Sequence, residues 1–166
     1  MKTWFLLSIL ATILALSFAG FAQAVYPDRP VTLIANYSAG GGADLSSRAL
    51  AKRAEKILGQ PIAVVNKAGA GGTIGMAAVA AAKPDGYTIG VTTFAPLTMA
   101  PHVHDVPYHP LKDFEYIMGY GQYLYGPCVR SDSQFKTLKD LVQYAKANPG
   151  KIKYSCVTLT APNHFG

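Results

Sequence analysis

Short runs of β-branched and aliphatic residues alternate with amphipathic or alanine-rich segments from Tyr26 onward, and clusters of glycine separate them. This alternation is typical of βαβ units, in which parallel strands form a sheet and helices cover it. The chain is therefore expected to adopt an α/β fold. The predicted strands lie at residues 31–35, 62–65 and 87–92, and the predicted helices lie at residues 45–58 and 74–82.

The first predicted helix has aliphatic side chains on one side and charged side chains on the other. Asp44 stands directly before this helix, where an acidic residue can cap its free N–H groups, and Gly59 stands where a helix commonly ends. We expect the helix to turn its aliphatic side chains toward the sheet, namely Leu45, Ala49, Ile57 and Leu58.

The remainder of the chain is predicted to cross into a second unit near residues 121–129. Prolines punctuate residues 101–110, which indicates a surface connection. Because a strand, a helix and a strand cannot bury a core alone, the second unit is expected to be incomplete. The expected elements are strands at residues 116–118, 123–125 and 152–156 and a helix at residues 138–147; the expected lobes are residues 25–122 and 123–166.

Residues 1–24 have the form of a secretory signal peptide. A basic start at Lys2 precedes an apolar run, and the small residues Ala22 and Ala24 mark the exit. We therefore expect a periplasmic protein that is not embedded in the membrane after cleavage. A disulfide is permitted in that compartment, but the spacing of Cys128 and Cys156 leaves their pairing open.

Several function classes fit the sequence poorly. The formal net charge is +6, and the basic residues are scattered without the interleaved aromatic residues of a nucleic-acid surface. No dinucleotide or P-loop glycine pattern occurs, and no nucleophile elbow is present, so no cofactor and no catalytic residue are predicted. The histidines at 102, 104 and 109 lie in a proline-rich stretch, which favours surface positions over a metal site.

The glycine cluster at residues 40–42 is the strongest candidate for a binding loop. Ligands of open parallel sheets bind beyond the carboxyl ends of the strands, and a strand order of two, one, three would place the first and third exits side by side. Glycines let a ligand approach backbone N–H groups, and the start of the following helix favours an anion. Asp44 either only caps this helix or also recognises an amino or hydroxyl group of the ligand.

Six stretches together resemble the Bug-type substrate-binding proteins of tripartite tricarboxylate transport systems. They are YPDRPVTLI at 26–34, SAGGGAD at 38–44, LGQPI at 58–62, NKAGAGGTIG at 66–75, KPDGYT at 83–88 and ANPGK at 147–151. The resemblance implies a periplasmic-binding-protein type II fold, a two-lobed clamshell that closes around a small organic acid, here truncated in the second lobe. It also implies delivery of a mono-, di- or tricarboxylate to membrane transporter subunits, with no enzyme activity.

The resemblance implies a ligand site formed by the first glycine loop, the exit of the third strand and a loop of the second lobe. Asn36 departs from the family, which often has proline there, and the second-lobe loop lacks the usual glycines. A ligand-sensing partner of a membrane kinase and a periplasmic enzyme acting on an organic acid are the alternative functions. The implied ligand-binding residues are Tyr37, Ser38, Ala39, Gly40, Gly41, Gly42, Asp44, Thr92, Thr93, Thr158, Thr160 and His164.

Overall fold

The computed structural model describes residues 25–156. The predicted signal peptide, residues 1–24, and the predicted second-lobe loop, residues 157–164, lie outside the described residues. Over the described part, no helix has both the length and the apolar character needed to cross a membrane.

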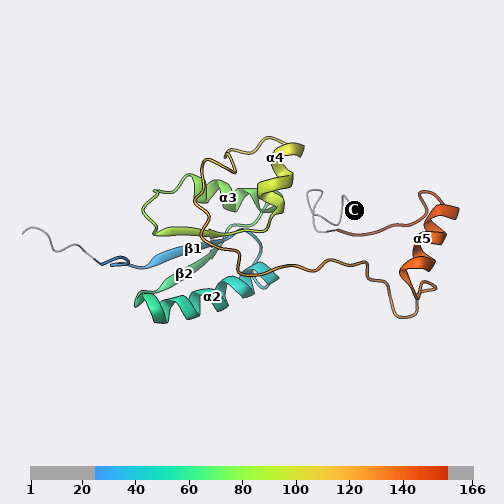
Figure 1. Ribbon diagram of the computed structural model, residues 1–166, viewed down its shortest axis with the longest axis horizontal. Helices are drawn as coiled ribbons and strands as arrows, with labels where there is room; N and C mark the ends of the chain where they lie inside the picture. Colours follow the sequence, from blue (N-terminus) through green and yellow to red (C-terminus); the bar gives the residue numbers. More distant parts are fainter. Residues whose placement is uncertain (1–24, 157–166) are drawn as a thin grey trace, which may run out of the picture.

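A three-stranded parallel sheet forms the centre of the fold (Figure 1). Strand β1 (Val31–Ala35) lies between β2 (Ile62–Asn66) and β3 (Thr88–Val91), so the predicted order of two, one, three is confirmed. Because β1 is central, its side chains are covered from both faces, and Leu33 is only 2% exposed. The core cluster of the sheet contains Val31, Leu33, Ala51, Ile62 and Val91.

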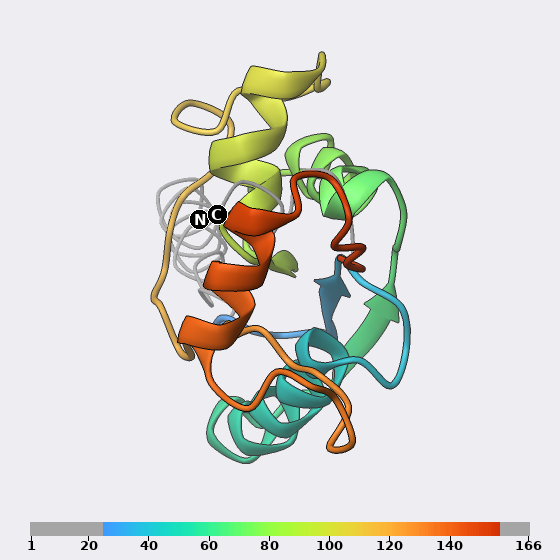
Figure 2. The same ribbon diagram turned by 90° about the vertical axis from the view of Figure 1, so that its right-hand side faces the viewer.

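The two connecting helices cover opposite faces of the sheet, α2 (Gly42–Leu58) on one and α3 (Thr73–Ala80) on the other (Figures 1 and 2). The chain moves sideways from β1 to β2 and then crosses back over β1 to β3. Because both crossovers of a parallel sheet are right-handed, this reversal places the helices on opposite sides.

Helix α2 begins three residues earlier than predicted and turns a different side toward the sheet. Gly41, not Asp44, is its N-cap residue, and Gly59 ends it in the left-handed conformation as predicted. The four aliphatic residues expected to be inward are exposed, with Leu45 at 60% and Ile57 at 85%. Small or polar residues on one side of the helix are buried instead, because they allow the helix to approach the sheet closely: Ala43, Asp44, Ser47 and Ala51.

Helix α3 also packs closely, as its alanine-rich sequence predicted. A short 3₁₀ turn at Ala70–Gly72 leads into it. Gly75 has no room for a side chain. An added Cβ would lie 2.8 Å from Asn36 Cα and 2.9 Å from the Lys67 carbonyl oxygen. Glycine at this position therefore sets the distance between α3 and the end of β1.

The predicted surface connection, residues 101–110, is mostly exposed, and a short helix, α4 (Ala100–Val103), begins it. A π-helical turn at Ala95–Met99 precedes this helix, and each of the two has proline in its first turn, where the missing N–H has no intrahelical role. Tyr108 is buried and donates to the Pro96 carbonyl oxygen. The prediction missed this helix because its one proline, Pro101, lies in the first turn, where a helix tolerates proline.

The strands predicted at 116–118, 123–125 and 152–156 are absent: residues 114–130 and 151–156 form no sheet pairing. Extended backbone becomes a strand only beside a hydrogen-bonding strand, and no described strand pairs with these residues. The predicted helix is present as α5 (Leu138–Ala147), with a capping box between Thr137 and Asp140, and it lies on the side toward which the strands point (Figure 1).

Replacing Gly75 with alanine should destabilise the fold by about 1–3 kcal/mol, because the new Cβ meets backbone atoms that cannot move aside. For a domain of this size that corresponds to a fall in melting temperature of roughly 4 °C or more. Thermal unfolding of Gly75→Ala, with Gly119→Ala as the control in open space, measures the effect. An unchanged melting temperature would show that the packing of α3 does not constrain this position.

Candidate functional site

Three loops meet at the carboxyl edge of the sheet, and side chains of the β1 loop join them. The Asn36 Nδ2 donates to Thr92 Oγ1 at 3.1 Å, on the loop after β3, and lies 3.5 Å from the Gly72 carbonyl oxygen, on the loop after β2. Tyr37 repeats the pattern, because its hydroxyl donates to the Gly71 carbonyl oxygen at 3.2 Å and lies 2.9 Å from Thr93 Oγ1. The predicted site residues Tyr37, Thr92 and Thr93 are thus neighbours.

Asn36 is completely buried at this junction. Its Oδ1 has no hydrogen-bond partner among the described residues, although its amide nitrogen is engaged. Leaving a buried acceptor unpaired costs about 1–3 kcal/mol, so this residue is unusual in the core. Sequence reasoning noted Asn36 only as a departure from the family; a polar amide directly after an apolar central strand was the available signal.

Tyr37 is a neutral hydrogen-bonding group at this junction. Burial raises the pKa of its phenol, and the neighbouring phenol of Tyr125 acts in the same direction, whereas the hydrogen bond to Thr93 acts against them. The hydroxyl is therefore protonated at neutral pH and fixes the positions of the two adjoining loops.

The glycine loop, residues 38–42, is exposed along its whole length. It leads into the first turn of α2, whose N–H groups have no acceptor within the helix. Gly40 adopts a left-handed φ of 82°, whereas Gly41 has an extended conformation that any residue can adopt. An added Cβ at Gly41 would meet only the Ser38 carbonyl oxygen, at 3.4 Å. The predicted loop residues Ser38, Ala39, Gly40, Gly41 and Gly42 therefore form one accessible backbone surface.

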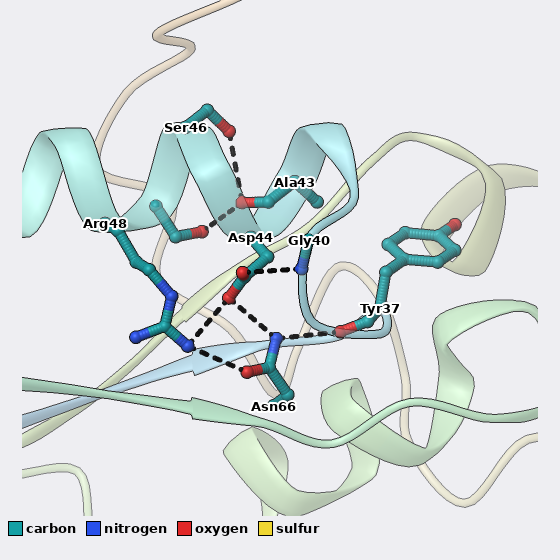
Figure 3. A network of polar contacts seen from close by, with 8 residues as sticks. Tyr37, Gly40, Ala43, Asp44, Ser46, Arg48 and Asn66 are labelled. Carbon is teal, nitrogen blue, oxygen red and sulfur yellow. Dashed lines mark hydrogen bonds and ion pairs between the residues drawn. The ribbon is translucent and has the colours of Figure 1, made fainter.

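The buried carboxylate of Asp44 fixes the shape of this loop (Figure 3). Its Oδ2 accepts from the Gly40 N–H at 2.8 Å, and its Oδ1 accepts from Asn66 Nδ2 at 2.9 Å and pairs with Arg48 Nη2 at 3.0 Å. Asn66 Nδ2 also donates to the Tyr37 carbonyl oxygen at 3.0 Å. The carboxylate thereby connects the loop, the first turns of α2 and the end of β2.

The same contacts hold Asp44 in its charged form. The Arg48 hydrogen bond is the largest cause, the Gly40 N–H and the Asn66 amide add to it, and together they lower the pKa of Asp44 to about 2. Both carboxylate oxygens are occupied within the fold, and the side chain is only 3% exposed. Of the two roles left open by the sequence, this arrangement favours support of the loop over direct contact with a ligand.

Three tyrosines from the segment after α4 border the glycine loop, and sequence reasoning missed them because it assigned this segment to strands. Tyr120 and Ser46 share a hydrogen bond of 3.1 Å between their hydroxyl oxygens. The ring of Tyr123 lies within 3.3 Å of the point where a Cβ of Gly42 would stand. The signal in the sequence was the density of tyrosine, at positions 120, 123 and 125.

The remaining predicted site residues, Thr158, Thr160 and His164, lie outside the described residues. Between residues 25 and 156, no group of three or more His, Cys, Asp or Glu side chains is arranged to hold a metal ion. The histidines at 102, 104 and 109 are exposed.

Comparison with known proteins identifies one family. Residues 46–166 match the model of the TctC family, described as the tripartite tricarboxylate transporter family receptor. A curated protein from the gbd 5′ region of Cupriavidus necator is 42% identical over 129 residues, which cover 78% of this chain and 39% of that protein. The chain spans about half or less of the length of the curated relatives that it matches, between 39% and 52%.

Solved structures agree with this match. The periplasmic binding protein BugD is 34% identical, with a TM-score of 0.66 over 84% of this chain and 47% of BugD. MatC from Rhodopseudomonas palustris, solved with bound malate, is 38% identical, with a TM-score of 0.51 over 54% of this chain and 31% of MatC. The fold class expected from the sequence, that of periplasmic binding proteins, is confirmed over the aligned part.

The pKa of Asp44 predicts an acid-dependent loss of stability. Because its folded value is lowered from 3.8 to about 2, the charged carboxylate stabilises the fold above pH 4, and this contribution is lost as the pH falls toward 2. Asp44→Asn should lower the melting temperature at pH 7 and flatten its dependence on pH between 4 and 2. Thermal melts across this range measure both effects.

The exposed Asp105 is the matched control, because no hydrogen bond or ion pair joins it to another described residue. Asp105→Asn should behave like the unmodified chain at every pH. If Asp44→Asn lost stability between pH 4 and 2 as steeply as the unmodified chain, the Asp44 network could not be the source of that loss.

Proposed function

The chain belongs to the tripartite tricarboxylate transporter receptor family, and from this premise we propose that it is a periplasmic solute-binding protein that captures a small carboxylate for the membrane subunits of such a transporter. The observation that carries the proposal is the exposed glycine loop at residues 38–42, held in shape by buried Asp44 at the start of α2. Backbone N–H groups of this kind, at a helix N-terminus, favour an anion.

The proposed ligand site combines the exposed loop with the neighbouring strand exit. Residues Tyr37 to Gly42 line the site. The Gly40 N–H is already bound to Asp44 and the Gly41 N–H to the Ser38 carbonyl oxygen, so the backbone donors offered to a ligand are those of Ser38, Ala39 and Gly42. Thr92 and Thr93 lie beside the loop through the hydrogen bonds of Asn36 and Tyr37, and Asp44 acts by fixing the loop. The predicted Thr158, Thr160 and His164 would complete the site from a second lobe. The proposal therefore keeps the division into a first lobe, residues 25–122, and a second lobe beginning at residue 123.

Two findings on relatives support this class of ligand and location. MatC was solved with bound malate, a dicarboxylate, and BugD is described as a periplasmic binding protein. The signal peptide predicted for residues 1–24 agrees with this location. We propose reversible binding without covalent chemistry, because the family is defined by receptors rather than by enzymes.

A small carboxylate that binds only the folded chain should raise its melting temperature by mass action, and a ligand at 100 times its dissociation constant stabilises by about 2.7 kcal/mol. We expect at least one acid from a panel of malate, succinate, citrate and benzoate to give such a shift in thermal melts. Gly41→Leu should abolish the shift, because Gly41 can take a side chain without strain and the new side chain would cover the loop.

Ala49→Leu is the matched control, since Ala49 is exposed on α2 away from the loop. This variant should keep the ligand-induced shift. A chain that melts cooperatively and responds to no acid of the panel would contradict the proposed function, and a shift retained in Gly41→Leu would exclude the glycine loop as the site.

A further inference from the structure

The tyrosines that border the glycine loop form an aromatic surface. Tyr123 and Tyr125 are two residues apart in an extended segment, so their side chains leave the same side, and their ring centroids are 6.2 Å apart at an interplanar angle of 34°. Leu124, between them, is 90% exposed. Tyr120, Tyr123 and Tyr125 are together called the tyrosine wall below.

The wall stands directly against the beginning of α2. An added Cβ at Gly42 would lie 3.2 Å from the Tyr123 hydroxyl oxygen and 3.3 Å from its Cε1. The hydrogen bond between Tyr120 and Ser46 fixes the segment one turn further along the same helix. A carboxylate bound at the loop would therefore have the rest of its molecule beside phenol rings.

The phenols of the tyrosine wall and of Tyr37 influence one another's titration. Burial is the largest cause that raises the pKa of Tyr123, and the phenols of Tyr120, Tyr125 and Tyr37 act in the same direction. Burial also raises the pKa of Tyr37, and Tyr125 adds to this effect. The wall offers phenol rings, and none of its side chains is a cation that could hold a second carboxylate.

The wall remains available for contact. Tyr120, Tyr123 and Tyr125 are 38%, 48% and 53% exposed. Tyr120 uses its hydroxyl on Ser46, whereas the hydroxyls of Tyr123 and Tyr125 have no hydrogen-bond partner within residues 25–156. Exposed ring surface beside an anion-binding loop suits a ligand that combines one carboxylate with an aromatic ring, because aromatic pairs add about 0.5–1.5 kcal/mol to area burial.

We infer that the tyrosine wall determines specificity: Tyr123 and Tyr125 select a carboxylate that bears an aromatic ring, whose carboxylate lies on residues 38–42 and whose ring packs against theirs. This inference rests on the proposed carboxylate-binding function and narrows its substrate class. A saturated ring of the same size has no quadrupole to match the phenol rings, so it gains burial alone.

Benzoate and cyclohexanecarboxylate form the deciding pair of probes, with malate as a reference without a ring. Both ring acids carry one charge at pH 7 and have similar size, and the saturated ring is the more apolar. If burial of apolar surface alone determined affinity, cyclohexanecarboxylate would bind at least as tightly as benzoate. Calorimetric titration of the purified chain should show that benzoate binds about twofold to tenfold more tightly than cyclohexanecarboxylate. This ratio corresponds to the free energy that an aromatic pair adds to area burial.

Three variants locate the effect. Tyr123→Leu/Tyr125→Leu should bring the ratio of the two affinities close to one, whereas Tyr123→Phe/Tyr125→Phe keeps the rings and should retain the preference for benzoate. Leu124→Ala changes the opposite side of the segment and should leave the ratio unchanged. Since Tyr123, Leu124 and Tyr125 are each at least 48% exposed, these substitutions remove little buried surface.

The outcomes separate the two proposals. Binding of malate or cyclohexanecarboxylate with no preference for benzoate overturns the inference and leaves the receptor function standing. A preference for benzoate that survives in the leucine double variant also overturns it, because another surface must then select the ring. Failure of all three acids to bind contradicts the carboxylate-binding function, and the inference falls with it.

Discussion

The buried carboxylate of Asp44 is the constraint on which the geometry of the binding edge depends. It binds the Gly40 N–H, the Asn66 amide and the Arg48 guanidinium at once, so a flexible glycine loop, the first turns of α2 and the end of β2 share one charged group. Charge-assisted hydrogen bonds are stronger than neutral ones. With the carboxylate held internally, the loop keeps its shape, and the N–H groups of Ser38, Ala39 and Gly42, which have no hydrogen-bond partner among residues 25–156, remain to receive an anion.

The strand order determines what that loop can meet. Because β1 is central, the residues after it contact the exits of both neighbours, Thr92 and Thr93 after β3 and Gly71 and Gly72 after β2. Other contacts stabilise the opposite edge of the sheet, at the amino ends of the strands. There the Arg29 guanidinium lies 3.8 Å from the Tyr87 ring centroid and pairs with Asp85. These contacts join the segment before β1 to the segment before β3. Most of the family-like stretches thus serve one of these two edges.

The parts predicted correctly from the sequence are those that local physics determines. Strands β1 to β3, helix α5 and the end of α2 at Gly59 follow from periodicity and from glycine, and the strand order is the common order of open parallel sheets that the sequence analysis assumed. The inward face of α2 was wrong because burial of Asp44 and close approach to the sheet outweigh the exposure of Leu45 and Ile57. The density of tyrosine at positions 120, 123 and 125 did not indicate where these side chains lie, since the contact of Tyr123 with Gly42 joins residues far apart in sequence.

The same comparison explains why residues 114–130 form no strand. Alternating apolar side chains predict extended backbone, and the backbone is extended there, but hydrogen bonds to a neighbour are a tertiary property that no local pattern supplies. Tyr116, Ile117 and Leu124 consequently remain more than half exposed, while Tyr120 and Tyr123 are anchored to α2. The anchoring gives this segment a defined place beside the loop without a sheet. Its tyrosines can therefore act as one side of a binding site even though the segment itself is not a strand.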